Sequence, residues 1–317
     1  MKRLLVAASL ALIAAPVLAQ QPTVEAGIPA YQKTSGVSGN INSVGSDTMN
    51  NMMALWAETF RKLYPHVKIQ IEGKGSSTAP PALIGGTSQF GPMSRAMRST
   101  EIDQFEAKYG YKPTQIRTSY DALAIYVNKD NPLDKITLAQ ADAIFSKTRR
   151  RGGKSVSTWG DLGLTGDWAG RPISLYGRNS ASGTYGFFKE HTLKNGDYKD
   201  SVKEQPGSAS VVQGVTEDRF GVGYSGIGYK TSGVKALQLA ETTQFFDGSY
   251  DNVKSGKYPL TRFLYIYVNK APGKPLDPLV KEYMKLILSK DGQEVVVKDG
   301  YDPLPAAIVA EELKKLE

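Results

Sequence analysis

Three short segments combine glycine with serine or threonine at places where helices are expected to begin. They have the sequences GSDT, GSST and SASGT at residues 45–48, 75–78 and 180–184. The first N–H groups of a helix have no partner inside the helix, and the helix dipole places about half a positive charge there. An oxyanion at such a position accepts hydrogen bonds from N–H groups and from neighbouring hydroxyls. Each segment alone could be an ordinary helix cap, but the three together predict a binding site for a small anion.

A positive charge accompanies the third segment. Arg178 follows the apolar run PISLY at 172–176 and precedes Ser180 by two residues. The run is an expected strand, and in an open α/β sheet ligands bind at the carboxyl ends of strands. A guanidinium there can donate two hydrogen bonds to one phosphate group, although a solvated surface arginine would look the same in the sequence. Arg95 occupies a similar place after the run FGPMS at 90–94.

The residues that hydrolases and metalloenzymes use most are scarce. The chain has no cysteine, and neither of its two histidines, His66 and His191, lies in a spacing for zinc or for a Ser-His pair. The stretch from residue 223 has Ile227 where a nucleophile elbow needs glycine, and GKGSST at 73–78 lacks the order of a P-loop. The acidic residues match no calcium-loop spacing. The sequence therefore favours a binding protein over an enzyme, with no cofactor and no metal.

The N-terminus has the pattern of a secretory signal peptide. Lys2 and Arg3 precede an apolar run at residues 4–18, and small residues then predict cleavage after residue 19. The run has about 15 residues, fewer than the roughly 20 that a membrane-spanning helix needs. Without cysteine the mature chain can carry neither a disulfide nor a lipid on an N-terminal cysteine. These features predict a soluble protein in the periplasm of a Gram-negative bacterium.

The charge pattern argues against nucleic acid as the ligand. Loss of Lys2 and Arg3 with the signal peptide would lower the formal net charge from +8 to +6. Basic residues are spread among acidic ones, and the densest cluster, residues 149–151, lies in a glycine-rich turn. A nucleic-acid site needs a basic patch or stripe. A small anionic ligand suits this charge better.

Short strands alternate with helical patterns along the chain, which predicts an α/β protein with mostly parallel sheets. Apolar residues recur at helical spacing in the segments 48–64, 279–288 and 306–316. The mature chain of about 300 residues exceeds what one core usually serves, so we expect two domains. The expected strands are IQIEG at 69–73, DALAIYVN at 121–128, PISLYG at 172–177, VGYSGIGY at 222–229 and RFLYIYVN at 262–269.

One local pattern occurs twice. The stretches LAIYVNKDNP at 123–132 and FLYIYVNKAP at 263–272 share a strand, an Asn-Lys pair and a following proline. Two such strands could be ordinary buried strands, or they could carry the chain from one lobe to another and back. We interpret them as the strands of a hinge. This interpretation predicts one lobe formed by residues 36–119 and 268–317, and a second lobe formed by residues 120–267.

Four motifs, in their order along the chain, resemble those of one family. SVGSDTMNNMMALW, EGKGSST, FGPMSR and GRNSASGTYGFF look like motifs of the periplasmic phosphate-binding proteins of phosphate ABC importers, the PstS type. The resemblance covers residues 36–305, and its most specific part is R-x-x-x-S-G-T at residues 178–184. It is strongest to the Pseudomonas-type members, which share stretches such as TWGDLGLTGDW and KDGYDPLP.

The resemblance implies a type II periplasmic-binding-protein fold, with two α/β lobes joined by a two-strand hinge and a ligand cleft between them. It implies high-affinity capture of inorganic phosphate in the periplasm and delivery to a membrane permease, without covalent chemistry. We expect the protein to act as a monomer. Carried over by position, the phosphate-binding residues are Thr48, the backbone N–H of Met49, Ser76, Arg178, Ser182, Gly183 and Thr184.

The sequence departs from the family at two places. The best-known members have an aspartate that accepts the proton of hydrogen phosphate where Arg95 stands here, and often an aspartate that supports the arginine where Ser180 stands. Such an acceptor rejects sulfate, because a buried acceptor that faces another acceptor stays unpaired. Some branches of the family carry Ser-Arg at this point, so Ser94 and Arg95 are expected to donate hydrogen bonds to phosphate.

The acceptor role would then fall to another carboxylate. Asp47 lies in the first anion segment and Asp121 heads the first expected hinge strand, so both are candidates. A binding protein for another tetrahedral oxyanion, such as sulfate, remains the alternative function. A phosphoester hydrolase built on the same helix starts is the less favoured alternative, since no base or metal ligand accompanies them.

Overall fold

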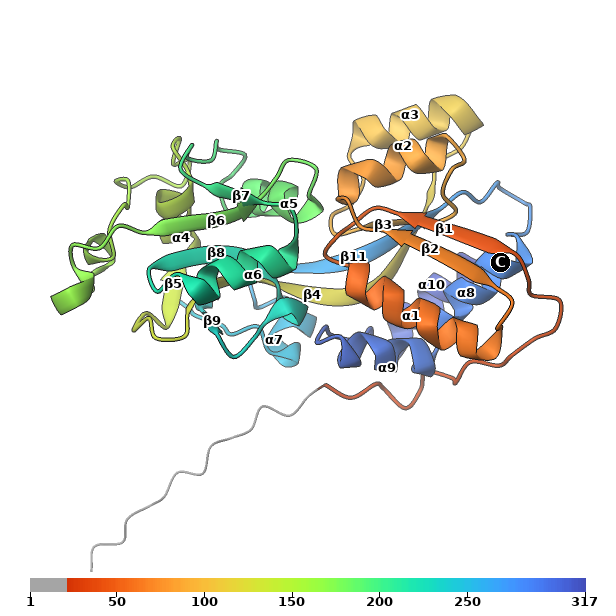
Figure 1. The fold of residues 1–317 in the computed structure, drawn as a ribbon. Coiled ribbons are helices and arrows are strands. Elements are labelled where there is room, and N and C mark those ends of the chain that lie inside the picture. Colours follow the sequence, from red (N-terminus) through yellow and green to blue (C-terminus); the bar gives the residue numbers. More distant parts are fainter. Residues whose placement is uncertain (1–21) are drawn as a thin grey trace, which may run out of the picture.

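The computed structural model describes residues 22–317, so the signal peptide expected at residues 1–19 lies outside the described residues. The chain forms two halves that lie side by side, with a long strand passing between them (Figure 1). Helices pack on sheet strands in both halves, which is the α/β class that the sequence predicts. Within the described part of the chain, no helix is long and apolar enough to cross a membrane.

The first half combines the N-terminal part of the chain with its C-terminus. Its helix α1 follows the apolar spacing expected from the sequence and buries Trp56, which donates to Gly292 O of α9, and Phe60, which packs on Tyr283 of α8. The elements of this half are β1 (Asn40–Val44), α1 (Asn50–Leu63), β2 (Lys68–Glu72), η1 (Ser76–Thr78), α2 (Ala79–Ile84), β3 (Gly91–Met93), α3 (Ser99–Tyr109), β11 (Thr261–Val268), α8 (Pro278–Leu288), α9 (Lys290–Lys298) and α10 (Ala306–Lys314).

The second half is formed by the middle of the chain. Its helix α4 begins at Thr137, whose hydroxyl accepts a hydrogen bond from Gln140 N at 3.1 Å, as a helix cap does. The elements of this half are β5 (Lys135–Thr137), α4 (Leu138–Phe145), η2 (Gly160–Leu162), η3 (Gly166–Trp168), β6 (Ser174–Arg178), α5 (Gly183–His191), β7 (Lys203–Gln205), α6 (Ser208–Glu217), β8 (Gly221–Gly226), η4 (Ile227–Tyr229), β9 (Val234–Ala236), β10 (Gln238–Ala240) and α7 (Tyr250–Lys254).

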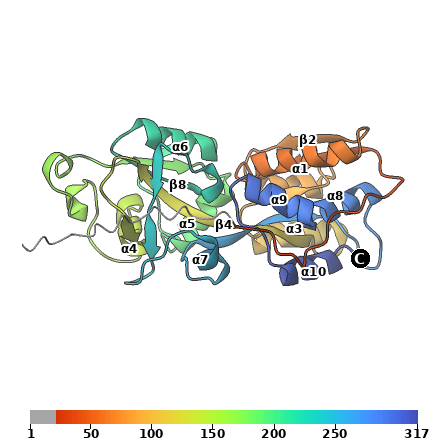
Figure 2. The ribbon, with the colours of Figure 1, turned by 90° about the horizontal axis from the view of Figure 1, so that it is seen from below.

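Strand β4 (Thr114–Asn128) passes from one half to the other (Figure 2). Its residues 114–122 pair with β11 in the first half, and residues 123–127 pair with β8 in the second. The chain returns just before β11, where Leu123 N donates to Leu260 O at 3.0 Å. Of the two similar strands in the sequence, β4 makes the crossing, whereas β11 lies against β3 and β4. The lobe boundaries expected at 119/120 and 267/268 stay a prediction.

One seven-stranded sheet continues through both halves, in the order β3-β11-β4-β8-β6-β7 with β9 also paired to β4. The pairings of β11 with β3 and β4, and of β4 with β8 and β9, are antiparallel. The pairings β1–β2, β5–β10, β6–β7 and β6–β8 are parallel. The expectation of mostly parallel sheets is therefore wrong, because the strand that crosses between the halves runs against its neighbours on both sides.

Aromatic packing fixes the helix that carries the third anion segment. Phe188 of α5 is fully buried, and its ring stacks on the ring of Tyr224 in β8 with centroids 4.0 Å apart. Burying a phenylalanine side chain contributes about 1.5–3 kcal/mol. The hydroxyl of Tyr224 in turn accepts a hydrogen bond from Arg178 N at 3.2 Å. The start of α5 and the end of β6 are thus held in a fixed relation to β8.

Candidate functional site

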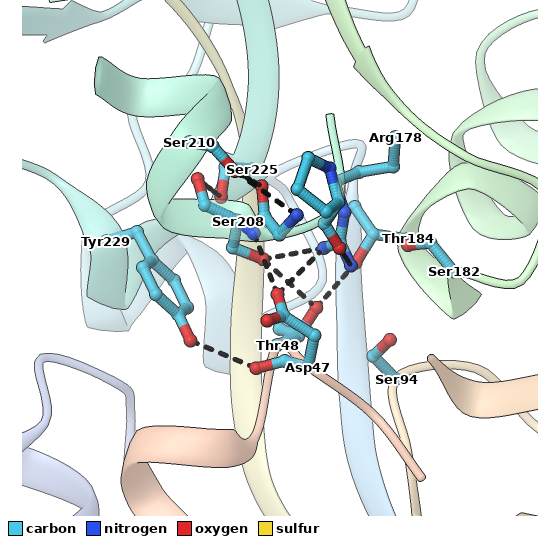
Figure 3. A network of polar contacts seen from close by, with 12 residues as sticks. Asp47, Thr48, Ser94, Arg178, Ser182, Thr184, Ser208, Ser210, Ser225 and Tyr229 are labelled. Atoms are coloured by element: carbon cyan, nitrogen blue, oxygen red, sulfur yellow. Dashed lines mark hydrogen bonds and ion pairs between the residues drawn. The ribbon is translucent and has the colours of Figure 1, made fainter. Parts of the chain in front are cut away.

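The anion segments expected from the sequence meet between the two halves (Figure 3). Thr48 Oγ1 lies 2.8 Å from Thr184 Oγ1, so the first segment contacts the third. Ser76 Oγ lies 3.2 Å from Ser94 Oγ, so the second segment contacts the loop after β3. The buried hydroxyl residues at this meeting point, named here the hydroxyl cluster, are Thr48, Ser76, Ser94, Ser182, Thr184 and Ser208.

Two glycines let these segments approach one another. A Cβ atom on Gly183 would lie 2.3 Å from Ser76 Oγ, and one on Gly75 would lie 2.5 Å from Ala181 O. Gly75 also has a φ of +121°, a backbone conformation that favours glycine. The close approach allows Ser77 N to donate to Ala181 O at 3.1 Å. The second and third segments are therefore in direct contact across the two halves.

Helix α5 presents its N-terminus to the cluster. Ser182 is its N-cap, and the Ser182 hydroxyl accepts a hydrogen bond from Tyr185 N at 3.2 Å. The N–H groups of Gly183, Thr184 and Met49 donate to no other residue in the described chain. Together with the positive end of the helix dipole, these groups are available to an anion in the cluster.

Arg178 ends strand β6 and is only 1 % exposed. Its Nη1 donates to Ser208 Oγ at 2.7 Å and lies 3.3 Å from Asp47 Oδ1. Its Nε is buried and has no hydrogen-bond partner among the described residues. Burial lowers the pKa of Arg178 and the Asp47 carboxylate raises it in part, yet a guanidinium stays charged in proteins. One buried, charged donor is therefore left for a ligand.

Ser208 belongs to the cluster although the sequence analysis did not single it out. It is the first residue of α6, it is fully buried, and its Oγ lies 3.5 Å from Thr48 Oγ1. The sequence around it, GSAS at 207–210, has the same small and hydroxyl residues as the three predicted segments. Because this segment resembles the other three helix starts, the sequence could have indicated Ser208 as a fourth candidate.

Arg262 is a second buried guanidinium that sequence reasoning missed. Its Nε and Nη2 donate to Asp121 Oδ2 at 2.8 and 2.6 Å, and Nη2 lies 3.0 Å from Thr184 Oγ1. A signal was present in the repeated pattern, because Asp121 and Arg262 head the matching stretches DALAIYVN and RFLYIYVN. Opposite charges at matching positions of two similar strands indicate a buried pair.

The two candidate acceptors lie in different surroundings. Asp121 Oδ1 accepts from Ile227 N at 3.1 Å and Oδ2 accepts from Arg262, so both its oxygens have protein donors. Asp47 Oδ1 accepts from Ser208 N at 2.7 Å, whereas no described residue donates to Asp47 Oδ2. The Asp47 carboxylate points towards Ser208 and the rest of the cluster (Figure 3). Of the two, Asp47 alone has a carboxylate oxygen left to accept a proton from a ligand.

Arg95 lies outside the hydroxyl cluster, unlike its neighbour Ser94. Its Nη1 and Nη2 donate to the two carboxylate oxygens of Glu101 at 2.8 and 2.7 Å. Burial raises the pKa of Glu101, but hydrogen bonds from Arg95 and Arg98 outweigh this and leave the pKa below its ordinary value. Glu101 thus holds the Arg95 guanidinium, whose contact with the anion segments is a hydrogen bond from Nη2 to Ser77 Oγ at 3.4 Å, outside the hydroxyl cluster.

A cavity of about 760 Å³ opens beside the cluster, and its walls include α3, α5 and β11. His191 lies in its wall, and burial lowers the pKa of this histidine. No group of three or more histidine, cysteine, aspartate or glutamate residues that could hold a metal ion is found between residues 22 and 317. No residue of the hydroxyl cluster lines this cavity, so the donors of the cluster itself are what suits a small anion.

Comparison with known proteins connects the whole chain to one family. A family model described as a PBP superfamily domain matches residues 30–291. The phosphate-binding protein PstS of Pseudomonas aeruginosa is 57% identical over 321 residues, which cover 100% of this chain and 99% of that protein. The phosphate-binding protein PstS of Staphylococcus saprophyticus is 26% identical over 284 residues, which cover 88% of this chain and 85% of that protein.

Solved structures have the same fold. A protein proposed to be the substrate-binding protein of a phosphate ABC transporter from Clostridium perfringens, solved with bound phosphate, matches with a TM-score of 0.72 at 24% identity. The match covers 84% of this chain and 100% of that one. An ABC-type phosphate transport receptor from Vibrio cholerae matches with a TM-score of 0.66 at 22% identity and covers 83% of this chain and 100% of that one.

Proposed function

The chain belongs to the PstS phosphate-binding proteins of the PBP superfamily, and from this membership we propose that it captures inorganic phosphate between its two halves and delivers it to the permease of a phosphate ABC importer. It is a transport receptor and not an enzyme. The full-length identity of 57% to a phosphate-binding protein supports this ligand. The hydroxyls, N–H groups and guanidinium in the cluster support it independently, since these are the groups that bind phosphate in proteins.

The observation that carries the proposal is the direction of the hydroxyl protons in the cluster. Ser208 Oγ accepts a hydrogen bond from Arg178, and Ser76 Oγ accepts one from Ser94 N at 3.0 Å. Ser182 Oγ accepts from an N–H of its own helix. A hydroxyl that accepts from a donor on one side sends its own proton elsewhere. Each of these three hydroxyls therefore has a proton available for an anion at their centre.

Arg178 supplies the charge for the site. A phosphate anion loses its hydration when the two halves enclose it, and this loss must be offset by many donors at once. A charge-assisted hydrogen bond is roughly twice as strong as a neutral one. The unpartnered Nε of Arg178 and the N-terminus of α5 are the two groups that can supply such bonds without rearrangement.

We assign the proton-acceptor role to Asp47. Hydrogen phosphate has a proton to donate, and Asp47 Oδ2 has no donor among the described residues. Sulfate has no such proton, so a bound sulfate would cover this partly exposed oxygen without pairing it, at a cost of about 1–3 kcal/mol. That cost corresponds to roughly 5- to 150-fold weaker binding. Asp121 is less suited, because Arg262 and Ile227 already donate to both of its oxygens.

The set of proposed phosphate contacts follows from these arguments. Arg95 is not among them, because Glu101 holds its guanidinium. Ser208 is added because it lies in the cluster beside Arg178. The proposed contacts are Asp47, Thr48, the N–H of Met49, Ser76, Ser94, Arg178, Ser182, Gly183, Thr184 and Ser208.

The place of action and the partner are further parts of the proposal. The N-terminal pattern of the sequence supports export, and the relative with 57% identity is a phosphate-binding protein of Pseudomonas aeruginosa. We therefore place the mature chain in the periplasm, where it would act as a monomer and present bound phosphate to a membrane permease.

Calorimetric titration of the mature chain, stripped of bound anion, tests the proposal. We expect phosphate to bind with a Kd of about 1 µM or tighter, which is a net binding free energy of about 8 kcal/mol. Sulfate should bind roughly 5- to 150-fold more weakly at the same pH. Equal or tighter binding of sulfate would contradict phosphate as the ligand and favour the sulfate alternative. Turnover of a generic phosphomonoester would contradict the assignment as a non-enzyme.

A further inference from the structure

Arg262 is tied to the strands that connect the two halves. It stands directly opposite Asp121 in the antiparallel pair of β4 and β11. The two side chains are only 2 and 0 % exposed, and two N–H groups of the guanidinium donate to one carboxylate oxygen of Asp121. Buried ion pairs with two hydrogen bonds have a fixed geometry. The Arg262 guanidinium therefore has a fixed orientation next to the crossing point of the chain.

The same guanidinium contacts both halves of the molecule. Its Nη1 donates to Ser94 O at 2.8 Å in the first half, and its Nη2 donates to Thr184 Oγ1 at 3.0 Å in the second. The ring of Phe187 lies over it, with 5.4 Å from the guanidinium carbon to the ring centroid, on the side of the cavity. If the two halves separated, the contact with Thr184 would break, because Arg262 stays with β11 and Thr184 moves with α5.

We propose that Arg262 is a positioning residue for the phosphate site, one that turns the Thr184 hydroxyl towards the ligand when the halves close. An arginine can only donate, so Thr184 Oγ1 is the acceptor in this contact and its own proton points elsewhere. The other polar neighbour of Thr184 Oγ1 is Thr48 Oγ1, 2.8 Å away in the hydroxyl cluster. The Thr184 proton is therefore directed into the cluster. This inference rests on the function proposed above.

Arg262 acts through Thr184 and not by contact with the anion. Four of its hydrogen bonds already go to protein acceptors, out of the five N–H groups of a guanidinium. Asp121 balances its charge, whereas the Nε of Arg178 is buried and has no partner among the described residues. A hydroxyl that is oriented before binding loses less rotational freedom when the ligand arrives, which strengthens binding.

A double-mutant cycle tests this inference. Arg262→Met, Thr184→Val and the double variant are titrated calorimetrically with phosphate. Each single substitution is expected to weaken binding at least about 10-fold. If Arg262 acts through the Thr184 hydroxyl, the double variant binds no more than about 3-fold more weakly than the weaker single variant, because coupled residues are not additive. Losses that multiply in the double variant would overturn the inference.

A matched control separates positioning from a general effect on the fold. Arg117 is an arginine of the same strand pair, and Glu312 of α10 pairs with it away from the cluster. Arg117→Met should change phosphate affinity by less than about 2-fold while it lowers the melting temperature. If Arg262→Met fails to fold, Arg262→Lys takes its place in the cycle. Equal losses from Arg262→Lys in the parent and in the Thr184→Val variant would then overturn the inference.

The parent protein distinguishes this inference from the proposed function. If the parent binds sulfate instead of phosphate, the ligand assignment fails. The cycle can then be measured with sulfate, and it decides the role of Arg262 in the same way. Coupling between Arg262 and Thr184 with either anion supports the positioning role, and its absence with the anion that binds contradicts it.

Discussion

The hydroxyl cluster and the turn at residues 299–302 bury charged groups in opposite ways. At the cluster, each carboxylate accepts from a guanidinium or from an N–H group. Arg178 Nη1 lies 3.3 Å from Asp47, and Arg262 Nη2 donates to Asp121 at 2.6 Å. Charges buried in this manner are compensated within the folded chain, because each has a partner of opposite sign.

The turn between α9 and α10 has no such pairing. Oδ2 of Asp299 and Oδ2 of Asp302 are buried and have no partner among the described residues. Burial raises the pKa of Asp299 to about 7, and burial together with the nearby Asp121 raises the pKa of Asp302 to about 7. A carboxyl group in such surroundings takes up a proton instead of holding a charge near neutral pH.

The difference separates ligand affinity from stability. In the cluster, removal of one charge leaves its partner buried and unpaired next to the donors for the ligand, so it should act on binding. In the turn, Oδ2 of Asp299 and Oδ2 of Asp302 contact no residue of the cluster. Removal of either carboxylate should therefore change the stability of the fold, by an amount that depends on pH. The predictions below test this separation.

The largest effect is expected at Arg178. Arg178→Met removes the charged donor of the site and leaves Asp47 without its ion-pair partner. Truncation of a buried, hydrogen-bonded charge costs about 2–5 kcal/mol, so calorimetry should show phosphate affinity lower by at least about 30-fold. Arg171→Met, at an exposed arginine of the same half, is the matched control and should bind as the parent does. A loss below about 10-fold for Arg178→Met would show that the cluster does not depend on this charge.

A smaller effect is expected on selectivity at Asp47. Asp47→Asn replaces the proposed acceptor by an amide that can also donate, so sulfate no longer faces an unpaired acceptor. The ratio of phosphate to sulfate affinity should fall at least about 5-fold. Asp121→Asn is the comparison variant, since it should weaken both anions together through Arg262 and leave their ratio within about 3-fold. Competition titrations measure both ratios, and an unchanged ratio in Asp47→Asn would remove Asp47 from the acceptor role.

The turn should respond to pH in its stability. The pKa of Asp302 in the folded chain is about 7, above the ordinary 3.8, so the parent loses stability as the pH rises from about 4 to about 7. Asp302→Asn carries no charge and escapes this loss. Its melting temperature relative to the parent should be at least about 3 °C more favourable at pH 8 than at pH 4.5, from roughly 2–4 °C per kcal/mol.

An exposed aspartate provides the control for this pH dependence. Asp103 lies on the exposed face of α3, and Asp103→Asn should shift the melting temperature by the same small amount at both pH values. Phosphate affinity of Asp302→Asn should stay near that of the parent at pH 8. A tenfold loss of affinity in that variant would join the turn to the binding site and break the separation between the two regions.

The smallest effect is expected at Arg95. Glu101 holds its guanidinium through two hydrogen bonds, outside the hydroxyl cluster. Arg95→Gln should therefore change phosphate affinity by less than about 3-fold, although it lies next to the cluster residue Ser94. Calorimetric titration of Arg95→Gln and of Arg178→Met with phosphate compares the loss of affinity at two buried arginines that have different partners. A loss of tenfold or more would return Arg95 to the binding site, as the sequence alone led us to expect.

Several elements could be recognised from local patterns. The apolar spacing of α1 and α8 and the runs that became β2, β4 and β11 are visible in the sequence, because the periods of helices and strands repeat within a few residues. The directions of the strand pairs could not be recognised, since antiparallel pairing of β4 with β8 brings together residues about 100 positions apart. Because these long-range antiparallel pairs could not be seen in the sequence, the alternation of strands and helices predicted mostly parallel sheets.

The donor-rich helix starts and the family of this protein can be recognised from its sequence, because caps, unpaired N–H groups and glycine turns depend on adjacent residues. Which charged side chains lie beside those helix starts depends on the folded chain. Glu101 holds Arg95 outside the cluster, whereas Asp121 holds Arg262 beside Thr184. The position of a long charged side chain is fixed by its ion-pair partner, and that partner can lie far away in the sequence.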